Sequence, residues 1–437
     1  MIKFLVLILA ISFQFSNAIA VTRIDITRGT VEPISIAINE FSGNNPDAKA
    51  LADEVSKLIE SNLENSGLFK LVPEEAFIEH LNNPNTIPDF ASWRQIKAET
   101  ILIGSISAQS SGKISVEYRT WDSFSGKELI GKSYIAESKN WRKVAHKISD
   151  DIYTAVTGEQ GYFNTKIVYI AESGSAKKRV KKLALMDSDG YNNKYLSSGK
   201  YLVLTPRISP DATKILYLSY RDRKPHVHLL DINTGYDKII GNFPGMTYAP
   251  RFSKDAHSVI LSVANNGNSE IYDFNLNNGS KTKLTSGPWI DTSPDYSPDG
   301  SKIVFASDRS GMSQLYIMGK DGLNPNRISF GEGSYNTPAW SPRGDFIAFT
   351  KLVHGNFHIG VIRTDGSGER LLARGYLVEG PTWAPNGRLI MFTKAEVSSK
   401  NNAGRSKLYA IDLTGYNERE VPTNGDASDP CWSPLLK

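Results

Sequence analysis

A short pattern recurs six times along the C-terminal two thirds of the chain. Its copies read LTPRISPDA, YAPRFSKDA, TSPDYSPDG, NTPAWSPRG, EGPTWAPNG and SDPCWSP. Their prolines, separated by 44, 44, 44, 43 and 49 residues, are Pro206, Pro250, Pro294, Pro338, Pro381 and Pro430. The polar insert SSKNNAGRSK accounts for the longer last step. A four-stranded blade of a β-propeller takes about 40–45 residues, so the period predicts one blade for each copy.

The residues after each copy predict the other strands of a blade. A β-branched and aromatic run such as Lys302-Ile303-Val304-Phe305 follows the pattern and is typical of a buried strand. A third run then ends at a glycine, which favours a hairpin turn. These glycines are Gly190, Gly235, Gly279, Gly322, Gly366 and Gly415. A short fourth run, for example Lys281 to Leu284, completes four strands.

The two ends of the repeat region predict how the ring closes. The last copy, around Trp432, stops at Lys437 with no second strand after it, whereas the run from Lys166 to Ile170 lacks a proline-aromatic strand before it. We expect the C-terminal strand to enter the sheet begun at residue 166 as its innermost strand. This pairing would close a six-bladed propeller over residues 165–437 and leave no free sheet edge.

The serine, aspartate and glycine of each copy have two interpretations, a reaction centre or a turn. Ser297, Pro298, Asp299 and Gly300 occupy the positions that these residue types prefer in a type I turn, so we favour the turn. We expect the first proline of each copy to begin a strand, where a missing N–H donor is tolerated. We expect an aromatic residue to fill the space between adjacent blades at Tyr296, Trp340, Trp383 and Trp432.

Residues 34–160 show a different pattern, which predicts a small α/β domain. The run from Ile34 to Ile38 is typical of a buried strand. A helix follows, with Asn45 as its cap, Pro46 at its first position and Gly67 at its end. Strands are predicted near residues 101–104, 116–121 and 129–135, and a second helix near residues 144–156, with a linker at 158–164. The predicted fold class is therefore α+β and multidomain, a small N-terminal α/β domain followed by a six-bladed β-propeller closed by the C-terminal strand.

The first twenty residues predict export. Lys3 precedes an apolar run, and Ala18-Ile19-Ala20 fits a signal-peptidase site, so we expect a signal peptide over residues 1–20 that is cleaved near Ala20. A single cysteine, Cys431, excludes an internal disulfide framework. The formal net charge of +4 is too small to favour nucleic acid as the main partner.

Motifs for catalysis or metal binding are weak in this sequence. The chain contains no G-x-S-x-G elbow and no H-E-x-x-H motif, and Met186 to Gly190 resembles the start of a calcium loop without its twelfth ligand. We therefore expect no catalytic residue, no metal site and no cofactor. An exported propeller enzyme that acts on cell-wall glycans or peptides is the alternative. Its site would lie in the channel, where the innermost strands offer Arg207, Arg251, Asp295, Ala339, Thr382 and Cys431, which contain no evident acid-base pair.

The order of these parts resembles the TolB family of the periplasmic Tol-Pal envelope system. The repeat P-x-aromatic-S-P-D/N-G, the stretch Pro33-Ile34-Ser35-Ile36 and the run from Ala98 to Gly104 after Trp93-Arg94-Gln95 carry the resemblance over the whole chain. The first two copies depart from the family's repeat at four positions. Ile208 stands in place of the aromatic residue, Lys254 in place of the turn proline, and Ala212 and Ala256 in place of the glycine. The resemblance implies a non-enzymatic periplasmic adaptor that keeps the outer membrane joined to the cell wall, notably at division.

The resemblance also implies two partners, the peptidoglycan-associated lipoprotein Pal and the inner-membrane protein TolA. The Pal contact is expected at one mouth of the propeller, with the candidates Leu204, Thr205, Met246, Thr247, Tyr248, Ala249, Asp291, Thr292, Ser293, Asn336, Thr337, Glu379 and Asp429. The TolA contact is expected in the segment 21–33, with the candidates Val21, Thr22, Arg23, Ile24, Asp25, Ile26 and Thr27. This segment alternates apolar and polar residues, so it fits either a strand added to a partner's sheet or an edge strand of its own domain.

Overall fold

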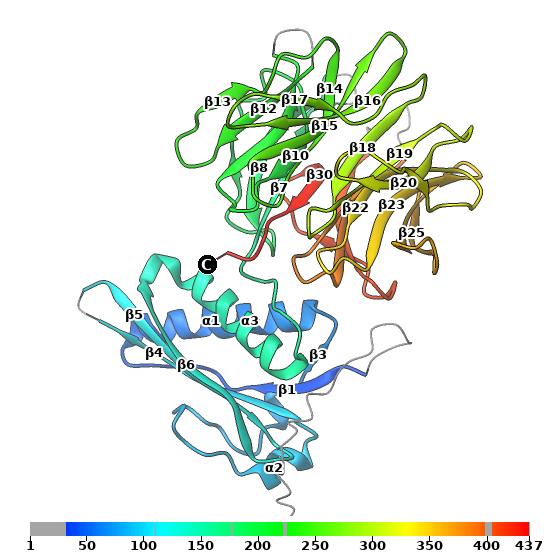
Figure 1. Cartoon of the computed structure of the whole chain (residues 1–437). Coiled ribbons are helices and arrows are strands. Elements are labelled where there is room, and N and C mark those ends of the chain that lie inside the picture. The colour runs from blue at the N-terminus through cyan, green and yellow to red at the C-terminus, as the bar shows by residue number, and fades with distance from the viewer. Residues whose placement is uncertain (1–31, 110, 176–177, 222–224, 398–403, 437) are drawn as a thin grey trace, which may run out of the picture.

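A computed structural model describes residues 32–109, 111–175, 178–221, 225–397 and 404–436. Figure 1 shows two parts, an N-terminal α/β domain and a β-propeller, with helices α1 (Pro46–Asn65) and α3 (Trp141–Thr157) lying between the N-terminal sheet and the propeller. The predicted fold class is confirmed. No helix in the described ranges is both long and apolar enough to span a bilayer.

The N-terminal sheet has the strand order β3-β1-β4-β5-β6, with β2 paired to β4. Its pairs β1–β3 and β1–β4 are parallel, whereas β4–β5 and β5–β6 are antiparallel. The remaining elements of this domain are β1 (Ile34–Ile38), β2 (Ser42–Gly43), β3 (Phe69–Leu71), η1 (Glu74–Ala76), α2 (Phe90–Gln95), β4 (Thr100–Ala108), β5 (Lys113–Asp122), β6 (Lys127–Glu137) and η2 (Ser138–Asn140).

Helix α1 begins and ends where its sequence signals predict. The side chain of Asn45 accepts a hydrogen bond from the backbone N–H of Ala48 at 2.8 Å, and Pro46 occupies the first turn, where no N–H is needed. Gly67, just past the C-terminal end, adopts a left-handed φ of 73°. The buried face of the helix, including Val55 and Ile59, packs in one core with α3 and with strands of the propeller.

Six four-stranded antiparallel sheets make up the propeller. The first blade contains β10 (Val203–Ile208), β11 (Lys214–Ser219), β12 (His226–Asp231) and β13 (Asp237–Ile239), and the second contains β14 (Met246–Phe252), β15 (Ser258–Asn265), β16 (Asn268–Asn275) and β17 (Lys281–Lys283). The third contains β18 (Asp291–Tyr296), β19 (Lys302–Ser307), β20 (Gln314–Gly319) and β21 (Asn326–Arg327). The fourth contains β22 (Ser334–Trp340), β23 (Phe346–Val353), β24 (Asn356–Arg363) and β25 (Arg370–Gly375), and the fifth contains β26 (Leu377–Trp383), β27 (Leu389–Ala395), β28 (Ser406–Asp412) and β29 (Arg419–Val421).

The closing blade joins the two ends of the repeat region, as predicted. Its strand order is β30 (Asp426–Trp432), β7 (Lys166–Ser173), β8 (Val180–Asp187) and β9 (Lys194–Tyr195). In its register Trp432 lies opposite Ile167, and the backbone N–H of Ser433 donates to the carbonyl of Lys166 at 2.8 Å. The C-terminal strand is therefore the innermost strand of the blade that starts at residue 166.

The prolines of the repeat do not begin strands, which corrects the sequence-based prediction. Pro294 lies inside β18, and the pairing with β19 shifts register between Thr292 and Asp295. The same shift occurs in the innermost strand of every blade. A β-bulge leaves a residue out of the ladder, so a proline without an N–H costs no hydrogen bond there.

The Ser-Pro-Asp-Gly segment is a turn, and its serine supports the hairpin. The N–H of Gly300 donates to the carbonyl of Ser297 at 2.8 Å, and the hydroxyl of Ser297 accepts from the N–H of Lys302 at 2.9 Å and donates to Asp299. The repeat aromatics also lie between blades, as predicted. For example, the indole of Trp383 in the fifth blade donates to the carbonyl of Ala339 in the fourth at 2.9 Å.

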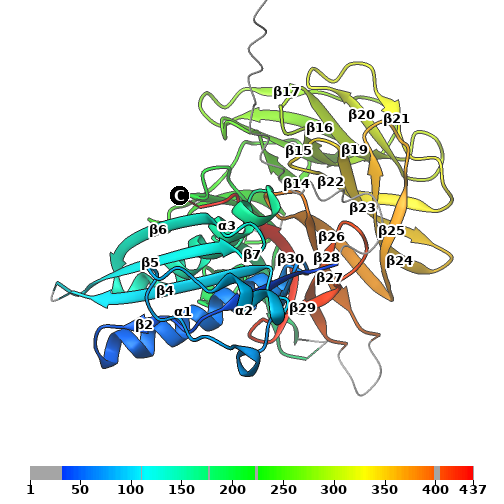
Figure 2. The same ribbon diagram turned by 90° about the horizontal axis from the view of Figure 1, so that it is seen from below.

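The segment between the two domains is packed rather than free. Tyr162 and Phe163 are buried, and the carboxylate of Asp150 on α3 accepts the backbone N–H groups of Phe163 and Asn164 at 2.7 and 3.0 Å. On the propeller side, Figure 2 shows β29 and β30 next to the N-terminal domain. There the side-chain amide of Asn417 donates to the carbonyl of Asn65 at 3.2 Å.

Candidate functional site at the mouth of the propeller

One end of the propeller is formed by two sets of loops, those that lead into the innermost strands and those that join the second and third strands. The two sets meet in space. The N–H of Ser269, which follows such a second-to-third turn, donates to the carbonyl of Trp289 at 3.2 Å, and the N–H of Ile290 donates to Asp308 at 2.8 Å. The N-terminal domain lies against the opposite end. In the part of the chain that the structure describes, this mouth is therefore open to a partner.

Each innermost strand has a backbone kink at the mouth. The residue before the repeat proline has a positive φ in all six blades, with values of 46°, 46°, 54°, 45°, 65° and 52° for Thr205, Ala249, Ser293, Thr337, Gly380 and Asp429. The kink turns an N–H toward a neighbouring blade. Ser293 donates to the hydroxyl of Ser262 at 3.2 Å, and Asp429 donates to that of Thr393 at 3.0 Å. The bulges thus fasten the blades together around the mouth.

Several of the predicted Pal contacts line one cavity at the mouth. The cavity has a volume of about 510 Å³, and it is bordered by Leu204, Thr205, Thr337, Glu379 and Asp429. Residues from the first, fourth, fifth and closing blades meet here, although they are far apart in the sequence. Met246, Tyr248, Ala249, Thr292, Ser293 and Asn336 lie on the kinked strands of the second, third and fourth blades.

Two of the predicted contacts have buried side chains. The hydroxyl of Thr247 accepts from the N–H of Val227 at 3.1 Å, and the carboxylate of Asp291 binds the guanidinium of Arg309 at 2.8 and 2.9 Å. Both side chains are 2–3% exposed, so they support the mouth from below and are not free to touch a partner.

Two acidic residues at the mouth, Glu172 and Glu379, have pKa values shifted in opposite directions. Burial alone would raise the pKa of Glu172, but hydrogen bonds from Lys181 and Ser428 outweigh it and lower the pKa, so this carboxylate stays ionised. For Glu379, burial together with the nearby charge of Asp429 raises the pKa. Arg179 lies 3.0 Å from both Glu172 and Asp426, so its guanidinium is held in the wall of the mouth.

The channel behind the mouth holds the residues between each proline and aromatic position. Arg251 lies 3.7 Å from Asp295, whose other oxygen accepts the N–H of Trp340 at 2.9 Å. Burial, with Arg251 as a nearby like charge, lowers the pKa of Arg207 to about 10, so Arg207 stays charged at neutral pH. Asp295 is thus engaged by a cation of one neighbouring blade and by a backbone donor of the other.

An exposed apolar ring surrounds the mouth, and sequence reasoning missed it. We define the apolar ring as Tyr201, Leu202, Met246, Trp289, Ile290, Phe330 and Tyr376, all of which are exposed. Five blades contribute to it through the loop or strand start at the mouth. Its sequence signal is an apolar residue at the start of the kinked strand or shortly before it in five of the six blades, and a lone residue of this kind does not reveal its exposure.

A second cluster, away from the mouth, brings together His146, Asp187 and Asp189. The amide nitrogen of Asn62 lies 3.0 Å from Nδ1 of His146, and because an amide nitrogen only donates, Nδ1 accepts and Nε2 carries the hydrogen. Burial lowers the pKa of His146 and keeps it neutral. Nε2, 3.7 Å from Asp189, therefore presents a hydrogen and not a lone pair to these carboxylates, which does not suit a metal ion.

Comparisons with known proteins match both parts of the chain. The model of the TolB amino-terminal domain matches residues 22–129, and that of the TolB β-propeller domain matches residues 153–436. The chain belongs to the TolB family. It is 55% identical over 430 residues to the Tol-Pal system protein TolB of Pelagibacter ubique, covering 96% of each chain, and 56% identical over 418 residues to that of Paramagnetospirillum magneticum, covering 95% of this chain and 94% of the relative.

A solved relative has the same architecture. The crystal structure of TolB from Acinetobacter baumannii superposes with a TM-score of 0.81 at 26% sequence identity, covering 93% of this chain and 98% of that chain. The resemblance found in the sequence is confirmed, and the chain is a component of the Tol-Pal system in a family of non-enzymatic envelope proteins. The predicted signal peptide and the candidates from Val21 to Thr27 lie outside the described residues.

Proposed function

We propose that the chain is a periplasmic adaptor that binds Pal at the mouth of the propeller and TolA through residues 21–33, after removal of a signal peptide near Ala20. Through these contacts it maintains the integrity of the outer membrane and its constriction at division. Membership of the TolB family supports the proposal, and the apolar ring around a polar mouth is the observation that carries it. Protein interfaces combine a buried apolar centre, rich in aromatic residues, with polar groups that fix register.

One aromatic side chain of the apolar ring, Trp289, is held in a fixed position. Trp289 is 37% exposed and its ring lies 5.0 Å from the guanidinium of Arg309, which holds it in place before a partner arrives. A preorganised aromatic side chain loses little conformational entropy on binding. Trp289 is therefore the anchor that we expect to contribute most to Pal affinity.

Retention of partners from detergent-solubilised envelope on the immobilised mature protein tests this proposal. The unmodified chain should retain a peptidoglycan-bound lipoprotein, and Trp289→Ala should weaken that binding by about ten-fold or more. Tyr236→Ala is the matched control, because Tyr236 is 65% exposed on the turn that follows β12, away from the mouth. Deletion of residues 21–32 should remove TolA and spare the lipoprotein. Retention of neither partner by the unmodified chain would overturn the proposal.

A further inference from the structure

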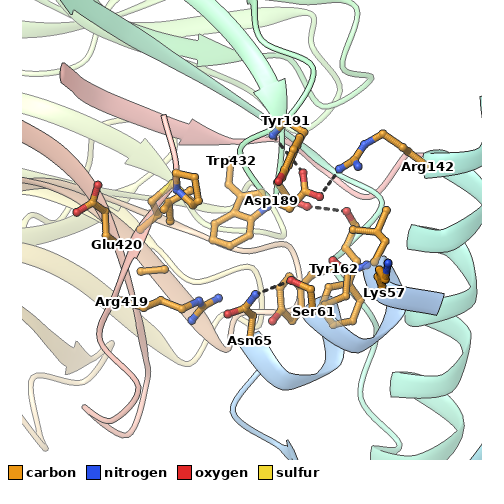
Figure 3. A pocket seen from close by; sticks show the side chains of 18 of the residues that line it. Lys57, Ser61, Asn65, Arg142, Tyr162, Asp189, Tyr191, Arg419, Glu420 and Trp432 are labelled. Carbon is orange, nitrogen blue, oxygen red and sulfur yellow. Dashed lines mark hydrogen bonds and ion pairs between the residues drawn. The ribbon is translucent and has the colours of Figure 1, made fainter. Parts of the chain in front are cut away.

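A cavity of about 390 Å³ lies between the N-terminal domain and the propeller, at the end opposite the mouth. Its size falls within the range of small-molecule sites, roughly 300–1,000 Å³. Helix α1 forms one wall with Ser61 and Asn65, and β29 forms the facing wall with Arg419, as Figure 3 shows. Neither domain alone encloses this space.

Arg419 is the one arginine of this cavity without an anionic partner among the described residues. The other, Arg142, lies within 3.5 Å of Asp187 and also binds Asp189. Arg419 forms no ion pair with any described residue, and its Nη1 is buried without a hydrogen-bond partner. A covered guanidinium nitrogen with no acceptor is costly, which makes an anion a favourable occupant.

Tyr162 provides a second polar group without a partner. Its side chain is 3% exposed, and its hydroxyl has no hydrogen-bond partner. Arg419 is close enough to act on it, since its charge opposes the rise that burial causes in the pKa of this phenol. The phenol ring packs edge-on against Trp432 with the centroids 5.9 Å apart. One side of the cavity therefore combines hydrogen-bond donors with aromatic surface.

The remaining charges decide the class of ligand. The acids Glu54, Asp189 and Glu420 and the cation Lys57 also border the cavity, so a doubly charged phosphate would meet several carboxylates. A single negative charge is enough to match Arg419. Trp432 and Met391 supply an apolar wall against which a ring can pack.

We propose that this interdomain cavity binds a small monocarboxylate with an aromatic body, its carboxylate on Arg419 and its ring against Trp432 and Tyr162. Such a ligand touches α1 and β29 at once. It is independent of the contacts proposed at the mouth, and it gives the interface between the two domains a binding role of its own.

Isothermal titration calorimetry of the full mature chain with N-acetyl-L-phenylalanine tests the proposal. N-acetyl-L-phenylalaninamide, which has the same ring and no charge, is the matched ligand control. The acid should bind and the amide should not. Arg419→Gln should weaken the acid by about ten-fold, the loss expected for a charge-assisted hydrogen bond. Tyr162→Phe should weaken it less, because the phenol is neutral.

Arg363→Gln is the control variant, because Arg363 is an exposed arginine at the end of β24, outside the cavity. It should leave the affinity unchanged. Equal binding of acid and amide, unchanged affinity in Arg419→Gln, or no heat up to about 10 mM acid would each overturn the proposal. The comparison of acid and amide uses the unmodified chain, so it decides the matter even if a variant unfolds.

Discussion

Replacement of Trp432 by alanine tests whether β30 closes the propeller, because Trp432 is a large buried side chain on that strand. Trp432 is 6% exposed and packs in the core that the propeller shares with the N-terminal domain. Its indole N–H donates to the hydroxyl of Thr165 at 2.8 Å. Removal of a buried tryptophan side chain costs about 3–5 kcal/mol of unfolding free energy, because the neighbours only partly fill the space left behind.

Variants separate the two contributions of this side chain. Trp432→Phe keeps most of the ring and loses the hydrogen bond to Thr165, so it should cost about 1–2 kcal/mol. Trp289→Ala is the control, because the same residue type is partly exposed at the mouth and its loss should cost no more than about 1 kcal/mol. Urea unfolding followed by far-ultraviolet circular dichroism is the suitable assay, since tryptophan fluorescence changes with the mutations themselves.

The result that refutes closure is specific. If Trp432→Ala lowers the urea midpoint no more than Trp289→Ala does, Trp432 does not lie in a sealed interior. Deletion of residues 426–437 is the stronger test. That chain lacks β30 and leaves β7 as an open edge, so an unchanged midpoint would mean that the ring is held in another way.

Two further predictions concern single side chains. Burial raises the pKa of Asp150 to about 7, above its unfolded value, so the folded chain holds this proton through the range of about pH 4–7 while the unfolded chain releases it. The stability from this group is present below about pH 4 and is lost toward pH 7, at up to about 1.4 kcal/mol per pH unit, and Asp150→Asn should remove that slope in urea titrations at several pH values. Ala256 has a φ of 57° where the third blade has Gly300 at 74°, so Ala256→Gly should stabilise the chain by about 0.5–1 kcal/mol. Gly300→Ala should destabilise it through the backbone alone, since a Cβ there would meet no atom within 4 Å, and thermal melts that shift both variants the same way would contradict this account.

Periodicity explains which features the sequence could predict. The spacing of the repeat and the unmatched strand at Lys166 were enough for the blade number and the closure, because each copy repeats the same local preferences. The sequence did not predict the bulge. Proline is tolerated both at the start of a strand and at a bulge, and its presence alone does not show which of the two positions it occupies. Pro294 sits at a register shift that depends on the pairing of β18 with β19.

The two sites depend on contacts that no local pattern contains. The kinked strands placed Thr205, Thr337 and Glu379 at one cavity, and that proximity follows from the ring rather than from any one segment. The interdomain cavity joins Asn65 and Arg419, which lie on different domains. The sequence could indicate neither their distance nor that Arg419 lacks a partner.

A repeated scaffold can form an asymmetric binding surface, because the bulges give every blade the same backbone conformation while the residue types differ from blade to blade. The six kinked positions share a positive φ although their residues range from glycine to aspartate. The apolar ring comes from five blades, whereas residues 422–425, which lead into β30, read PTNG and contribute none of it. Beside that gap the mouth is polar, with Glu379 and Asp429. A partner that seats an apolar surface on the ring must therefore present polar groups to the closing blade, and this fixes its rotation about the propeller axis.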